Sequence, residues 1–185
     1  PESCTSIGRD AFASCSSLQK VNLACKITNI QKGMFYECAN LTSVSLPTTV
    51  LTIESDTFTN CSKLKTVTLP SGLTSIGNNA FRGCSLLNNV TIPSTVKSIG
   101  ISAFYNCSSL TSIEIPSGVT KLEDDTLNGC TSLVSLVIPS TVTSIGNNTF
   151  TKCTGLKNIT TPVFNTLFQE TFGSNATTIV LNGGG

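Results

Sequence analysis

The amino-acid sequence of 185 residues predicts one elongated solenoid of stacked parallel β coils. Three observations support this fold. A cysteine recurs every 23 residues, apolar residues recur at fixed distances from it, and a short alternating segment followed by proline ends each unit. Charged residues make up only 11% of the chain, and the formal net charge is +1. This composition indicates a folded core and argues against nucleic-acid binding.

The repeats keep one register throughout. Three residues before each recurring cysteine stands a phenylalanine, replaced once by Leu127, and three residues after it stands a leucine. The next columns hold Val, Ile or Leu and then proline, with Ala24 in place of the first proline. The cysteine column comprises Cys15, Cys38, Cys61, Cys84, Cys107, Cys130 and Cys153. One coil is too small to bury these side chains alone, so we expect neighbouring coils to stack into a continuous core.

Each repeat contains one segment typical of a β-strand. Residues 64–70, LKTVTLP, alternate apolar and polar positions and are rich in β-branched residues. One strand per 23 residues leaves too long a return for a hairpin, so the strands should stack in parallel, about 4.8 Å apart. Residues 73–76, LTSI, predict a second, shorter extended stretch. The AFxxC step predicts one helical or 3₁₀ turn, with Gly and Asn suited to positive φ or to a cap.

A period of roughly 20–29 residues with an L-x-x-V-x-L core is the length class of leucine-rich repeats. The expected fold class is therefore an α/β leucine-rich-repeat solenoid that is mostly β, a right-handed stack of parallel coils joined by short 3₁₀ or helical turns. Residues 1–162 are expected to hold about seven repeats, with residue 1 inside one of them. Residues 163–185 are expected to form a C-terminal capping segment.

The capping prediction follows from a change of pattern. After residue 162 the cysteine position is lost, and Phe164, Phe168 and Phe172 appear at a spacing that places three rings on one face. These rings would cover the last coil, and residues 177–182, TTIVLN, would add a final strand to the open edge. The alternative is that the three rings form an exposed docking patch for a partner.

The unit IPSxVTSIGxxAFxxCxSLxxV resembles the BspA-type (Treponema-type, 23-residue) leucine-rich repeat, and the resemblance covers residues 1–162. It implies a segment of a large cell-surface or secreted protein, of the kind found in host-associated bacteria and parasitic protists. It also implies adhesion toward host matrix proteins and cells, and it implies no catalytic residues and no cofactor. The sequence itself contains no signal peptide and no apolar run long enough to cross a bilayer.

The cysteines admit two interpretations. A metal ladder or a disulfide spine would need converging ligands or complete pairing, and a column with one thiol per coil offers neither. We therefore expect the column to hold buried free thiols that act as small apolar side chains, and we read Cys4 in the same way. Cys25 lies in the loop after a strand, where other repeats have Thr or Ser. It is the candidate for an exposed thiol or an intermolecular bridge.

Catalytic chemistry is not indicated by the sequence. The chain has no histidine, which excludes His-dependent triads and zinc hydrolase sites. Glu123, Asp124 and Asp125 form the densest acidic cluster, which is either a calcium or acid–base site or a set of turn caps. The cluster lacks the spacing of a calcium loop, so capping is the favoured interpretation. We expect no enzyme activity, no metal and no cofactor.

The outward positions of the strands form the predicted binding surface, because side chains on the outer face of an extended sheet can change without disturbing the packing of the core. Val134 and Val137 are the apolar exceptions on this face and are either a contact patch or ordinary scatter. The candidate ligand-binding residues are Lys20, Asn22, Lys65, Thr68, Asn88, Thr91, Glu114, Val134 and Val137.

The leading hypothesis is a non-enzymatic adhesion or protein-interaction module that binds a host matrix or cell-surface protein or a glycoconjugate. The alternative is an assembly element that stacks end to end or with other subunits. The isolated chain would be a monomer in the first case and would self-associate in the second. Neither hypothesis involves nucleic acid or membrane insertion by this segment.

Overall fold

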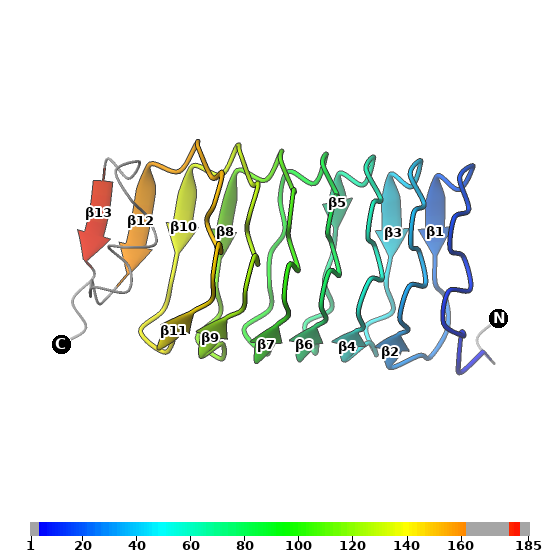
Figure 1. The fold of residues 1–185 in the computed structure, drawn as a ribbon. Helices are drawn as coiled ribbons and strands as arrows, with labels where there is room; N and C mark the ends of the chain where they lie inside the picture. The colour runs from blue at the N-terminus through cyan, green and yellow to red at the C-terminus, as the bar shows by residue number, and fades with distance from the viewer. Residues whose placement is uncertain (1–3, 162–177, 182–185) are drawn as a thin grey trace.

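A computed structural model describes residues 4–161 and 178–181 of the chain. The chain winds into a solenoid in which successive coils lie side by side, with a row of strands along one face and a row of shorter strands along one edge (Figure 1). All named strand pairs are parallel. The predicted parallel solenoid is therefore confirmed.

The strand face pairs equivalent residues of neighbouring coils. Val21 lies opposite Val44, and Val44 lies opposite Val67, so the register advances by one repeat at each step. The strands of this face are β1 (Lys20–Asn22), β3 (Ser43–Ser45), β5 (Thr66–Val67), β8 (Ser112–Glu114), β10 (Ser135–Val137), β12 (Asn158–Thr161) and β13 (Thr178–Leu181).

The face is divided into two sheets. One has the order β1-β3-β5 and the other β13-β12-β10-β8, and only an isolated bridge from Thr66 to Asn89 lies between them. The strand expected in the fourth repeat is therefore reduced to a single bridge residue. That repeat is the one with asparagine at both positions, Asn88 and Asn89, and asparagine is disfavoured in strands.

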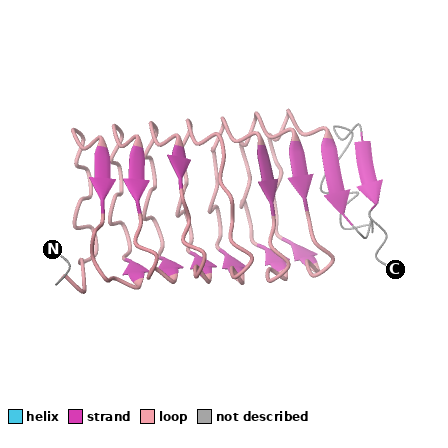
Figure 2. Cartoon of the chain, turned by 180° about the vertical axis from the view of Figure 1, so that it is seen from behind, coloured by secondary structure: helices cyan, strands magenta, loops and turns pink. Residues whose placement is uncertain are grey.

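A second row of two-residue strands confirms the predicted shorter extended stretch (Figure 2). It forms where a polar residue followed by Ile or Leu comes after the inward apolar residue of the turn. Its strands are β2 (Asn29–Ile30), β4 (Thr52–Ile53), β6 (Ser75–Ile76), β7 (Ser98–Ile99), β9 (Lys121–Leu122) and β11 (Ser144–Ile145).

The corner between the two rows is a chain of turns, and the described residues contain no helix. Tyr36 N–H donates to Gly33 O over 2.9 Å, and Cys38 N–H donates to Phe35 O over 3.1 Å, which is the i, i+3 bonding of 3₁₀ turns. The predicted helical turns thus appear as such bonded turns without regular helix. A left-handed residue stands two positions before and two positions after each Phe position, and this prevents a helix from propagating.

The left-handed positions repeat with the coil, which confirms the expectation that Gly and Asn suit positive φ at this corner. The first column holds Asp10, Gly33, Asp56, Asn79, Ser102, Asp125 and Asn148. The second column holds Ser14, Glu37, Asn60, Gly83, Asn106, Gly129 and Lys152.

The core is built from the inward columns. The rings of Phe12, Phe35, Phe58, Phe81 and Phe104 form a continuous stack, with centroids 5.3–5.5 Å apart and interplanar angles of 6–11°. Aromatic rings at this separation attract one another beyond the area that they bury. The stack ends where Leu127 replaces phenylalanine, and that side chain is also fully buried.

At the C-terminal end, β13 pairs in parallel with β12, with Ile179 opposite Ile159. The expected final strand is therefore present. The three phenylalanines of the predicted cap, Phe164, Phe168 and Phe172, lie outside the described residues.

Candidate functional site

The candidate binding residues lie on the strand face, where alternation along each strand turns one side chain inward and the next outward. Val134 is 41% exposed, whereas Val137 is half-buried because it lies between Glu114 and Thr160 of the neighbouring strands. The other candidates are all exposed, namely Lys20, Asn22, Lys65, Thr68, Asn88, Thr91 and Glu114.

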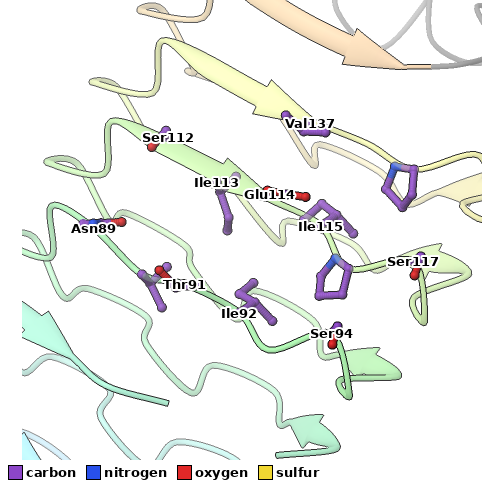
Figure 3. Close-up of a pocket in the computed structure, with 13 residues that line it drawn as sticks. Asn89, Thr91, Ile92, Ser94, Ser112, Ile113, Glu114, Ile115, Ser117 and Val137 are labelled. Carbon is purple, nitrogen blue, oxygen red and sulfur yellow. The ribbon is translucent and has the colours of Figure 1, made fainter. Parts of the chain in front are cut away.

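A groove of about 430 Å³ lies at the centre of this face, between the fourth repeat and β10 (Figure 3). Its floor is apolar, with Ile92, Ile113 and Ile115 supplied by two neighbouring coils. Its rim carries hydroxyl, amide and carboxylate groups together with one valine, contributed by Asn89, Thr91, Ser94, Ser112, Glu114, Ser117 and Val137. The groove thus combines an apolar base with convergent polar groups, which is the usual character of a binding site.

A second groove of about 490 Å³ adjoins the first on the N-terminal side. It is lined by Thr66, Thr68, Asn89 and Thr91 among other residues. Asn89 and Thr91 line both grooves, so the two hollows meet at the fourth repeat. Together they form a shallow surface that runs across several coils, which we call the central groove.

The central groove lies at the break between the two sheets, where only the Thr66–Asn89 bridge is present. Farther along the face, Ile115 N–H donates to Val137 O over 3.0 Å, and Ile138 N–H donates to Thr160 O over 2.8 Å. Among the described backbone hydrogen bonds, none joins Ile92 to Glu114 in the same way.

The central groove brings together Thr68, Thr91, Glu114 and Val137 of the predicted set. Lys20 and Asn22 lie in β1, and Lys65, Asn88 and Val134 do not line the groove. Sequence reasoning did not select its remaining polar lining, which is Thr66, Ser71, Asn89, Ser94, Ser112 and Ser117. The asparagine pair inside an expected strand was the signal that marked this coil as different.

The turn edge carries a second feature that the sequence reading missed. Arg82 lies over the ring of Tyr105, 4.6 Å from its centroid, which is a cation–π contact. Tyr36 occupies the same column, directly after the phenylalanine, and the chain has no other tyrosine than these two. A hydrogen bond to Glu37, and then the charge of that carboxylate, raise the pKa of Tyr36.

The cysteine column confirms the expected buried thiols and shows what each thiol does. Each buried thiol in this column donates to the backbone carbonyl of the Phe-column residue in the preceding coil, as from Cys61 Sγ to Phe35 O over 3.1 Å. Burial raises the pKa of Cys61 to about 12 and that of Cys153 to about 11. The buried thiols are therefore poor nucleophiles with a structural role.

The expected burial was wrong for Cys15 and is incomplete for Cys4. Cys15 belongs to the column but is exposed, because its coil has a complete neighbour on only one side among the described residues. Cys25, the candidate exposed thiol, is half-buried, and so is Cys4.

The acidic residues act as caps. Asp124 Oδ1 accepts the backbone N–H of Asn147 over 2.7 Å, and Glu54 Oε2 accepts the N–H of Lys32 over 3.1 Å. Lys121 neutralises Glu123 in an ion pair of 2.7 Å. Each carboxylate of this kind satisfies a backbone donor of a neighbouring coil, which agrees with the capping interpretation. Across residues 4–161 and 178–181, no three acidic or thiol side chains converge as a metal site would require.

None of the described residues forms a helix long and apolar enough to span a membrane.

Comparison with solved structures identifies close relatives of this fold. A leucine-rich repeat protein from Bacteroides ovatus is 33% identical, with a TM-score of 0.80 over 84% of this chain and 40% of its own. A leucine-rich repeat protein from T. pallidum is 30% identical, with a TM-score of 0.77 over 84% of this chain and 75% of its own. The pneumococcal vaccine antigen PcpA shares the fold alone, at 18% identity and a TM-score of 0.59 over 89% of this chain and 41% of its own.

This chain therefore spans less than half of the length of the Bacteroides ovatus protein. A comparison with curated proteins gave no match. The family model described as "BspA type Leucine rich repeat region (6 copies)" matches residues 1–88 and 74–181, which is most of the sequence. With its 23-residue register, its phenylalanine stack and its inward thiols, the chain belongs to the BspA-type leucine-rich repeat family.

Proposed function

We propose that this chain is a non-enzymatic protein-interaction module that binds a partner protein across the central groove. It acts as the repeat region of a larger cell-surface or secreted adhesin. Membership of a leucine-rich repeat family supports the protein-interaction role. The single observation behind the choice of surface is the central groove itself, an apolar floor with a polar rim on a rigid face. The partner class is a host matrix or cell-surface protein, or its attached glycan.

The groove lining indicates what a partner must offer. Glu114 is the only charged residue that lines the central groove, so a basic side chain of the partner gains an ion pair there. Val137 beside it is half-buried and supplies an apolar contact. The short Ser, Thr and Asn side chains around them offer donors and acceptors at low entropic cost.

The proposal is tested by surface plasmon resonance with the full chain and purified collagen, laminin and fibronectin as probes. Thr91→Arg and Glu114→Lys together fill the groove and reverse its charge, and we expect at least about a tenfold loss of affinity for the bound probe. Ser98→Arg is the matched control, because Ser98 is an exposed strand residue of β7 on the other row. If the double variant and the control bind a probe with equal affinity, the probe binds outside the central groove. If the chain binds none of the probes, the partner is not a matrix protein of this class.

A further inference from the structure

The first described coil has cysteines at two positions where the later repeats have other residues. Cys4 stands in the column that later holds Ile27 and Val50. Cys25 stands where later coils have Thr or Ser, directly after Ala24, which replaces the usual proline. Neither residue belongs to the buried cysteine column, and both are half-buried.

Cys4 and Cys25 lie beside a hydrogen bond that differs from its equivalents in the later coils. In the next coil, Thr49 Oγ1 donates to Ile27 O over 2.7 Å, and the same bond recurs two and four coils later. The first coil has Lys26 at the threonine position, and its backbone N–H donates to Cys4 O over 3.2 Å instead. In this loop the backbone N–H of Lys26 is the donor, whereas in the later coils a threonine hydroxyl is the donor. This loop therefore lies closer to the preceding segment than the equivalent loops of later coils do.

The bond brings Cys25 next to Cys4, because Cys25 directly precedes the donor Lys26 and Cys4 carries the acceptor carbonyl. A disulfide requires two cysteines on facing segments of this kind, with Cα atoms about 4.4–6.8 Å apart.

The thiols themselves are also neighbours. Burial, and then the charge and the hydrogen bond of the Cys4 thiol, raise the pKa of Cys25. Cys4 Sγ also donates to the backbone carbonyl of Ser6 over 3.3 Å, as the column thiols do to carbonyls of the preceding coil. Cys4 and Cys25 are outside regular strands, so the side-chain dihedrals that a disulfide needs are not restricted by a sheet.

We propose that Cys4 and Cys25 form an intramolecular disulfide that closes the first coil into a covalent ring. The oxidant is a small disulfide such as oxidised glutathione. The thiolate of one cysteine attacks it, which forms a mixed disulfide and releases one glutathione thiol. The second cysteine then attacks the mixed disulfide and releases the second glutathione. Two protein thiols and one glutathione disulfide thus become one protein disulfide and two glutathione thiols.

The ring spans residues 4–25, a segment whose core residues Phe12 and Leu18 are half-buried. A covalent link between the two ends of the coil limits its local unfolding.

Peptide mapping tests the link on the full chain. Trypsin cleaves after Arg9, Lys20 and Lys26, so residues 1–9, 10–20 and 21–26 form three peptides with one cysteine each. After oxidation by glutathione and alkylation of free thiols, we expect peptide 1–9 joined to peptide 21–26, and peptide 10–20 alkylated at Cys15. A link to peptide 10–20, disulfide-bonded dimers, or glutathione adducts without a link would overturn the proposal.

Hydrogen exchange tests whether the ring holds the coil. We expect amides of residues 4–25 to exchange about tenfold or more slowly in the oxidised chain than in the reduced chain. Cys25→Ser should remove this difference, and Cys15→Ser should retain it as the matched control. Equal exchange in oxidised and reduced wild-type protein would reject the stabilising role of the ring.

Discussion

Lys152 holds a backbone angle that its side chain disfavours. Its φ is 62°, in the left-handed region, at a corner position where Gly83 and Gly129 stand in two earlier coils. A side chain with a Cβ atom costs free energy in this region, and glycine does not. Long-chain residues such as Glu37 and Lys152 at this position are therefore places where the repeat tolerates strain.

We expect Lys152→Gly to raise the free energy of unfolding by up to about 1 kcal/mol, because it relieves this strain at an exposed site. Chemical denaturation monitored by circular dichroism measures the change. Thr151→Gly is the matched control, since Thr151 is an exposed neighbour without a positive φ. It should give no gain, and equal gains at both positions would contradict the strain argument.

The buried thiols link stability to pH. The pKa of Cys61 is about 12 in the folded chain against 9.0 as the ordinary value, because burial disfavours the thiolate. Below pH 9 this thiol is neutral in both states, and its stabilising contribution is complete. Between pH 9 and about 12 the unfolded thiol loses its proton first, so the free energy of unfolding falls as pH rises.

Denaturation curves on both sides of pH 9 should therefore show an alkaline loss of stability that is smaller in Cys61→Ala than in the wild type. The variant is less stable at neutral pH, because it loses the thiol–carbonyl bond to Phe35 and leaves a small cavity. The diagnostic quantity is the change of the free energy of unfolding with pH, and not its value at neutral pH. Parallel slopes would show that the thiol titrates normally in the folded chain.

Among the structural elements, the phenylalanine stack contributes most to the core. Five rings lie in line, each in contact with the ring of the next coil, so that a ring removed from the middle loses two partners. The natural Leu127 shows that the column also accepts a smaller side chain of similar character. The loss of folding free energy on substitution in this column should therefore increase with the volume of the cavity that the substitution leaves.

We expect Phe81→Ala to lower the free energy of unfolding by roughly 3–5 kcal/mol, since it opens a cavity between two stacked neighbours. Phe81→Leu should cost less than about 2 kcal/mol, because it reproduces the substitution found at Leu127. Urea denaturation of the two variants measures the difference. A loss below about 1 kcal/mol for Phe81→Ala would show that the stack is not a structural core.

At the scale of the whole molecule, the sequence predicted the parallel coils, the two rows of strands and the buried columns, because each depends on a residue type that recurs. It did not predict the gap between the two sheets. That gap coincides with the one repeat that has asparagine at both positions, Asn88 and Asn89, and averaging over repeats hides a single departure. The exposure of Cys15 was missed for a related reason, since its position in the repeat is the same as that of the six buried cysteines of the column.

The same periodicity predicts how the molecule responds to loss of sequence. Deletion of residues 71–93 removes one complete coil and joins Pro70 to Ser94, so every remaining column stays in register. We expect a folded protein with a cooperative thermal transition. Deletion of Thr111 alone shifts Ile113 and Ile115 from the inward to the outward side of β8 and should destabilise far more. Thermal melts compare the two, and a more severe effect of the larger deletion would contradict a modular solenoid.

The hydrogen bonds between coils have a mechanical consequence. Bonds such as Thr42 N–H to Gln19 O, and Lys97 N–H to Thr74 O, both 2.8 Å, join equivalent positions of successive coils and so run along the solenoid axis. A pulling force on the two ends is parallel to these bonds and loads the end coils first, which peel away one after another. Each released coil lengthens the chain by about 75 Å, from 23 residues at roughly 3.5 Å each less one coil spacing of about 5 Å. A solenoid of this design yields in equal steps under load, and it dissipates work at each step.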